Sequence, residues 1–312
     1  MKILLGTDGS RYARHAARFL RNSLDEAQPL GIDVLAVLPG TGPTSSGPVN
    51  PEFAERWADE AASLFTDLPG EVHTLVTQGD PGRVLVERSV DYDLVVVGVK
   101  GRGAAPFFEL GSTALAVIRH ASAPVLLVRP PGRDSARSSA REGVAGHPPR
   151  PLQLLLTSDV EDATLETARG LLDRFTRRDA VVELVSVLEP GATLPPPPGR
   201  ARWSRLPRGE ARQLAAGWLD SAVREMGATY ASPRGRILEG EPAREIARRA
   251  ADEASDLIVL GTRCPHAAPG GPLGRTAREL AWSAPCSVLL VRAHVAPHAA
   301  AVTGDDDARP TL

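Results

Sequence analysis

The chain carries the same unit twice, and this repeat constrains the fold more than any other feature of the sequence. The segment "SAPVLLVR" at 122–129 returns as "PCSVLLVR" at 285–292. A longer segment, "GDPGRVLVERSVDYDLVVVG" at 79–98, returns as "GEPAREIARRAADEASDLIVLG" at 240–261. Because similar segments recur in the same order, we expect two units of one architecture within the 312 residues.

The boundaries of the two units follow from composition. Between the copies, "PGRDSARSSAREGVAGHPP" consists mainly of Pro, Gly, Ser and Arg and has almost nothing to bury. Such a segment favours a flexible linker. The last residues, ending in "TGDDDARPTL", have the same character. We therefore expect a first domain at 1–130, a linker at 131–150, a second domain at 151–293 and a disordered tail at 294–312.

Within each copy, short apolar runs alternate with helical patterns. "NPEFAERWADEAASLF" places Pro51 at a first helical position, and Phe53, Trp57, Ala61 and Leu64 then share one helical face. Strands that are apolar throughout and separated by helices indicate a parallel sheet covered on both sides. Right-handed crossovers then predict a doubly wound, Rossmann-like α/β fold in each unit. In the first unit the expected strands are 2–7, 33–38, 71–77, 93–99 and 124–129.

Charge and composition exclude several classes of protein. The formal net charge is −2, which gives no electrostatic reason to expect nucleic acid or an acidic membrane surface as a partner. No apolar run approaches the roughly 18 to 20 residues of a membrane span, and the apolar stretch at the amino terminus is too short for a signal peptide. The two cysteines are too few for a disulfide framework or a thiolate metal site. We expect a soluble cytoplasmic protein.

The stretch "GVKGRGAAPFFELGST" is the candidate site. It follows an apolar strand, so it lies beyond a carboxyl end, where ligands bind in doubly wound sheets. Gly98 and Gly101 let backbone approach a ligand, while Gly111, Ser112 and Thr113 open a helix with N–H groups and the positive end of its dipole. Such a loop suits a phosphate. The alternative is that these glycines only make turns, since glycine-rich loops are common.

Charged residues around this stretch fit the same ligand. Lys100 and Arg102 can supply positive charge to a phosphate. Asp8 ends the first strand at the same edge, where its carboxylate can hold a ribose hydroxyl or a divalent cation that accompanies phosphates.

The spacing from Gly98 to Gly101 and on to Gly111-Ser112 resembles the ATP-loop pattern of the universal stress protein family. "ILLGTDGS", the 79–98 segment and "APVLLVR" resemble that family's first strand and turn, its third helix and fourth strand, and its last strand. The resemblance covers both copies. It implies a tandem member of the family that binds an adenine nucleotide, with strand order 3-2-1-4-5 in each unit.

By position, the resemblance also implies roles for individual residues. Thr7 and Asp8 would contact the nucleoside, and Val37, at the end of the second strand, would flank adenine. The phosphates of ATP, with or without Mg²⁺, would be held by Gly98, Gly101, Gly111, Ser112 and Thr113, with Arg102 as a further cation.

The second unit departs from this pattern in the corresponding loop, "GTRCPHAAPGGPLGRT". Cys264 replaces the second glycine and Arg275 the serine, and Pro265 removes an N–H donor. We expect weak nucleotide binding or none here, unless the charge of Arg275 preserves a second site. "LLGTDGS" returns as "LLTSDVE", which retains Asp159, although this residue could equally cap a helix.

Three functions remain compatible with the sequence: an ATP-dependent stress regulator, a nucleotide-independent interaction protein, and an enzyme of a related α/β fold. The turn "GTDGSRYA" lacks the Ser-Gly-Gly-x-Asp-Ser signature of ATP pyrophosphatases, and no Walker A motif occurs. The seven histidines show no ligand spacing, so no metal site is expected. We favour the regulator and expect no enzyme activity beyond slow ATP hydrolysis.

The strand order implied by the resemblance leaves one apolar strand at a sheet edge in each unit. Exposed apolar edges promote aggregation unless they are covered. We expect the two copies to cover each other, through residues 124–129 and 287–292, as a pseudo-twofold pair. Homodimerisation of the whole chain stays open.

Overall fold

A computed structural model describes residues 1–39, 50–102, 110–130, 150–157, 162–189, 208–262 and 273–292 of the chain. The expected linker and tail lie outside these ranges, apart from residue 150. Cys264, Pro265, Asp159 and Gly103 lie outside them as well.

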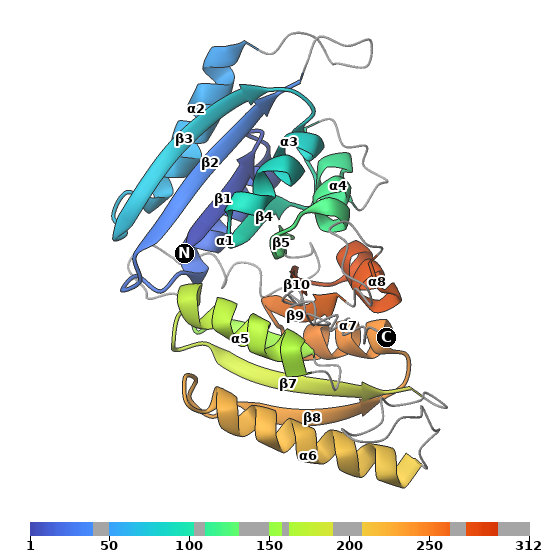
Figure 1. The fold of residues 1–312 in the computed structure, drawn as a ribbon. Helices are drawn as coiled ribbons and strands as arrows, with labels where there is room; N and C mark the ends of the chain where they lie inside the picture. Colours follow the sequence, from blue (N-terminus) through green and yellow to red (C-terminus); the bar gives the residue numbers. More distant parts are fainter. Residues whose placement is uncertain are drawn as a thin grey trace, which may run out of the picture.

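The first unit alternates strands and helices as the sequence predicted (Figure 1). The first three α-helices of this unit each begin at a side-chain cap: Ser10 caps the first, and Asn50-Pro51 and Asp80-Pro81 open the next two. The elements are β1 (Lys2–Thr7), α1 (Arg11–Ser23), β2 (Leu30–Leu38), α2 (Pro51–Ala62), η1 (Ser63–Phe65), β3 (Gly70–Gln78), α3 (Pro81–Arg88), η2 (Ser89–Asp91), β4 (Leu94–Gly98), α4 (Ser112–His120) and β5 (Val125–Val128).

The second unit repeats this order. Its helix α7 is again opened by an acidic cap, Glu241, followed by Pro242. The elements are β6 (Gln153–Thr157), α5 (Asp162–Phe175), β7 (Val181–Leu188), α6 (Arg208–Met226), β8 (Arg234–Glu239), α7 (Pro242–Asp252), β9 (Leu257–Thr262), α8 (Arg275–Ser283) and β10 (Ser287–Arg292).

The strands form one sheet of order β3-β2-β1-β4-β5-β10-β9-β6-β7-β8. Each half has the order 3-2-1-4-5, all parallel, so the doubly wound α/β fold is confirmed in both units. Each unit contributes five parallel strands to this sheet, the number expected from the sequence. The halves are continuous, because β5 pairs antiparallel with β10, with Leu127 opposite Val288 and Leu126 opposite Leu289.

Apolar layers lie on both faces of the sheet. One is formed with α1, α2, α5 and α6, and the other with α3, α4, α7 and α8. In α2 the buried face consists of alanines, among them Ala54 and Ala58. The expected face of this helix was therefore partly wrong, since Phe53 is 50% exposed and Trp57 only partly buried.

The contact between the units is reciprocal on both sides of the β5–β10 pair. On one side the ends of α1 and α5 meet: Asp25 N donates to Phe175 O at 2.8 Å, and Arg177 N donates to Ser23 O at 3.0 Å. On the other side an arginine at the end of each last strand reaches the end of the opposite unit's last helix. Arg129 Nη2 donates to the carbonyls of Ala281 and Trp282, and Arg292 Nη2 to those of Ile118 and Arg119, at 2.9 to 3.0 Å.

Candidate functional site

The candidate residues of the first unit gather at one edge of the sheet. Thr7 is the last residue of β1, Val37 the penultimate residue of β2 and Gly98 the last of β4. These three strands are adjacent and parallel, so their carboxyl ends lie together.

Asp8 joins the turn after β1 to the loop after β4. Its Oδ1 accepts a hydrogen bond from Ser10 N at 2.9 Å, and its Oδ2 accepts one from Arg102 N at 2.6 Å. An ionised carboxylate has about four lone-pair sites, so two acceptor positions are left for a ligand hydroxyl or a cation. Asp8 can therefore organise the loop and bind a ligand at the same time.

The turn after β1 depends on a glycine. Gly9 has a φ of 65°, in the left-handed region, and its N–H donates to Oγ1 of the buried Thr7 at 3.3 Å. A Cβ at Gly9 would lie 2.4 Å from the Trp57 ring. Trp57, in α2, thus packs directly against the turn that presents Asp8.

Arg102 is held by the same tryptophan. Its guanidinium carbon lies 4.0 Å from the Trp57 ring centre, and Nη2 donates to Gly9 O at 3.4 Å. Arg102 therefore joins the loop after β4 to α2 by a cation–π contact and to the turn after β1 by a hydrogen bond. The sequence placed Trp57 only on the core-facing side of a helix. No local pattern links residues 9, 57 and 102, because the tertiary fold alone brings them together.

Contacts within the protein itself account for the glycines at positions 98 and 101. A Cβ at Gly98 would lie 3.0 Å from the backbone C and O of Tyr12, and one at Gly101 would lie 2.6 Å from Asp8 Oδ2. Even without a ligand, a larger residue would require the Tyr12 backbone to shift at position 98 and the hydrogen-bonded Asp8 side chain to shift at position 101. The two glycines alone thus do not distinguish a binding loop from a closely packed turn.

The start of α4 is different. Gly111 is its N-cap residue and provides no side chain, and no capping side-chain bond to the first turn occurs within the described residues. A Cβ at Gly111 would approach no atom closer than Lys100 Cα at 3.4 Å, so packing alone does not demand glycine. The expectation that Gly111 itself offers a free N–H is wrong, because this group donates to Val99 O at 2.8 Å. Ser112 and Thr113, the first two residues of the helix, follow directly.

The corresponding edge of the second unit is only partly described. Gly261 lies near the end of β9 and Gly274 is the N-cap residue of α8, as their counterparts are in the first unit. Arg275 Nε donates to Glu279 Oε1 at 3.0 Å, and its Nη2 lies 3.6 Å from Glu241 Oε1. The cation that could have replaced the lost phosphate ligands is therefore paired with two carboxylates.

Two negative findings apply to the described ranges. They contain no group of three or more His, Cys, Asp and Glu side chains that could together hold a metal ion. Nor do they contain a helix with the length and apolar character needed to cross a membrane.

Comparison with known proteins identifies the family. The sequence profile described as "Universal stress protein family" matches residues 1–129 and again 154–292. A universal stress protein of Mycolicibacterium smegmatis is 26% identical over 307 residues, covering 93% of this chain and 96% of the relative. One from Thermus aquaticus is 34% identical over 143 residues, 41% of this chain and 97% of the relative. The crystal structure of a universal stress protein from Archaeoglobus fulgidus has the same fold, with a TM-score of 0.61 at 19% identity over 94% of this chain and 96% of that one.

Proposed function

The chain belongs to the universal stress protein family, and from this premise we propose that it is an ATP-binding regulatory protein of the stress response. The first unit holds the nucleotide. The second unit, whose loop residues differ, serves mainly as its structural partner. The proposal includes the domain boundaries given above and a cytoplasmic location, and it assigns no catalytic residue and at most slow hydrolysis.

One observation carries this proposal: the N-cap residue of α4 is Gly111, no side chain of the described residues caps the helix, and the preceding loop is bound to Asp8. The first N–H groups of such a helix, with the positive end of its dipole, favour a phosphate. Gly111 presents no side chain toward this position, and the hydroxyls of Ser112 and Thr113 can donate further hydrogen bonds.

The rest of the nucleotide fits around this point. Phosphates at Ser112 and Thr113 would run past Gly98 and Gly101, with Arg102 as an additional cation. Thr7 and Asp8 would contact the ribose, and Val37 at the end of β2 would pack against adenine. A single carboxylate with two remaining acceptor sites also suits Mg²⁺, which is commonly held by one or two carboxylates together with substrate phosphates.

A second candidate is a nucleotide-independent interaction protein. The contacts that explain Gly98 and Gly101 without a ligand favour it. It predicts that the protein purifies without nucleotide and that added ATP does not bind.

Calorimetric titration of nucleotide-free protein with ATP, together with mass spectrometry of any ligand released on purification, separates the two. Gly111→Val places a branched side chain at the expected phosphate position and should abolish binding. Gly274→Val is the matched control at the start of α8, where no atom of the described residues lies within 4 Å of the added Cβ, and it should bind ATP like the wild type. Normal ATP binding by folded Gly111→Val would show that the site has been misplaced.

A further inference from the structure

Gly82, at the start of α3, lies against the helix whose first turn forms the proposed phosphate site. A Cβ at Gly82 would lie 2.8 Å from Ala116 Cβ in α4 and 3.7 Å from Thr113 Cα. It would also lie 3.3 Å from Oδ1 of Asp80, the residue that caps α3 by accepting from Arg83 N at 2.8 Å. Gly82 is itself buried, so solvent offers no space for an added group.

The contact with Ala116 allows no local adjustment. A Cβ atom is fixed to its backbone and cannot rotate away, so any residue larger than glycine at position 82 must displace one helix from the other. Ala116 is one helical turn beyond Ser112. A displacement of α4 at Ala116 therefore also moves the backbone N–H groups of Ser112 and Thr113.

The second unit is built differently at this contact. "GDPGR" at 79–83 corresponds to "GEPAR" at 240–244, which puts Ala243 in the place of Gly82. The residue corresponding to Ala116 is Glu279, whose carboxylate accepts from Arg275. The close glycine–alanine contact is thus confined to the unit whose phosphate loop is intact.

We propose that Gly82 is a positioning residue for the nucleotide site. By letting α4 lie close against α3, it holds the first turn of α4 where the phosphates are to be bound. This inference rests on the proposed function, and it adds to the loop residues a residue in another helix. It assigns Gly82 a role in phosphate binding rather than in binding the nucleoside.

The test compares ATP with adenosine in calorimetric titrations of the full-length chain. Gly82→Ala should weaken ATP binding about tenfold or more, since small displacements of positioned groups carry large costs. Adenosine lacks phosphates, so its affinity should change by no more than about twofold, within the scatter expected when no contact is altered. If the role of Gly82 were purely structural, Gly82→Ala would lower the affinity for both ligands together or for neither.

Two further variants make the test specific. Gly82→Ala combined with Ala116→Gly removes the facing methyl group and should restore most of the ATP affinity. Gly170→Ala in α5 is the matched control, because it makes the same change at a position where no atom of the described part of the chain lies within 4 Å of the added Cβ, and it should bind both ligands like the wild type. If Gly82→Ala does not fold, Ala116→Ser is used instead. It adds a hydroxyl group to the same contact from the side of α4 and should lower the affinity for ATP but not for adenosine.

The outcomes are distinguishable. Unchanged ATP affinity in folded Gly82→Ala, with ATP-binding wild-type protein, would overturn this inference and leave the proposed function intact. Equal losses of affinity for ATP and adenosine, or no recovery of ATP affinity in the double variant, would also overturn this inference. Wild-type protein that binds no ATP would refute the proposed function, and this inference with it.

Discussion

The guanidinium of Arg102 lies 4.0 Å from the ring centre of Trp57, although the two residues come from different elements on the same sheet edge. The backbone N–H of Arg102 also binds Asp8. This loop arginine is thus fixed at both its backbone and its side chain, beside the carboxylate that is expected to contact the ribose. Its charge is placed before any ligand arrives.

From this contact we predict that Arg102→Gln lowers ATP affinity about tenfold while leaving adenosine binding unchanged, since a charge-assisted contact to phosphate is lost. Trp57→Leu should act in the same direction, because it removes the support of Arg102. Phe53→Leu is the control: this ring stacks on Trp57 at 6.5 Å and is half exposed. Titration at two salt concentrations tests the idea, and an Arg102→Gln protein with unaltered ATP affinity would contradict it.

A second prediction concerns Asp8. Asp8→Ala removes the acceptor of Arg102 N as well as the proposed ribose contact. Loss of one such hydrogen bond costs roughly 1 to 3 kcal/mol, or about 5-fold to 150-fold in affinity. The affinity for both ATP and adenosine should fall, whereas Arg102→Gln should lower the affinity for ATP alone. Isothermal titration with the two ligands measures this, and a loss for ATP alone would move Asp8 from the ribose to the phosphates or their cation.

The sequence predicted the doubly wound α/β fold of each unit because it follows from periodicity and repeats, whereas the strand order was implied by the family resemblance. Apolar runs gave the strands, β5 among them, and the loop glycines marked the edge of the sheet. Contacts between distant segments could not be predicted in this way. The contacts of Trp57 with Gly9 and Arg102 depend on how α2 packs. Phe53 is exposed because the alanines of α2 form the buried face of this helix.

The same limit applies to the glycines. Their pattern could not reveal that an added Cβ at Gly98 or Gly101 would crowd Tyr12 or Asp8, whereas one at Gly111 would meet only ordinary van der Waals contacts. Nor could it reveal that Gly82 meets Ala116, since the two residues are far apart in the chain. A pattern of small residues shows where side chains are excluded. Only the tertiary structure shows what excludes them.

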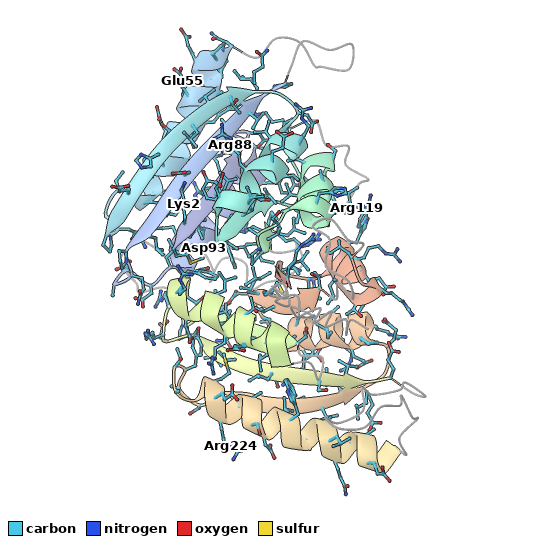
Figure 2. All side chains as sticks on the ribbon, viewed as in Figure 1. Lys2, Glu55, Arg88, Asp93, Arg119 and Arg224 are labelled. Carbon is cyan, nitrogen blue, oxygen red and sulfur yellow. The ribbon has the colours of Figure 1, made fainter. Side chains whose placement is uncertain are left out.

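A third prediction concerns pH. The hydroxyl of Tyr92 donates to Asp33 Oδ2 at 2.6 Å, and burial, followed by this hydrogen bond, raises the pKa of Tyr92 above its usual value near 10. Lys2 Nζ lies 3.5 Å from the same oxygen, and Figure 2 shows Lys2 beside Asp93, whose carboxylate accepts from Lys2 N. The folded state binds the Tyr92 proton more tightly than the unfolded state does.

The contribution of this proton to stability is therefore complete below about pH 10 and is lost as the pH rises further. Tyr92→Phe should flatten the fall in the free energy of unfolding above pH 10. A residual slope is expected from Tyr230, whose pKa is also raised, mainly by burial. Urea unfolding between pH 7 and 11 measures the slopes, and equal slopes in wild type and Tyr92→Phe would count against this account.

A fourth prediction concerns the contact between the units. Arg129 and Arg292 each donate two hydrogen bonds to carbonyl groups at the end of a helix in the other unit, where the helix dipole also favours a cation. Replacing either with Ala should lower the free energy of unfolding by about 1 to 3 kcal/mol. Arg119→Ala, an exposed side chain nearby (Figure 2), should change it by less than about 0.5 kcal/mol. Similar effects of all three substitutions in urea unfolding would argue that the reciprocal contacts contribute little.

The last prediction is that the chain binds one ATP tightly, in the first unit. The proposed phosphate site at the start of α4 would rely on backbone N–H groups beside Gly111, whereas the second unit has Cys264, Pro265 and Arg275 in the corresponding loop. Arg275 is also paired with Glu279 and Glu241, so using its charge for a phosphate would require these ion pairs to be rearranged.

Arg275→Ala should therefore leave both the stoichiometry and the affinity of ATP binding unchanged, while Gly111→Val should remove the single binding event. The competing outcome is a second site in which Arg275 substitutes for lost hydrogen bonds by a charge-assisted contact. Titration of nucleotide-free protein decides between them. About two ATP per chain with similar affinities, falling to one in Arg275→Ala, would establish the second site and reject the asymmetric assignment.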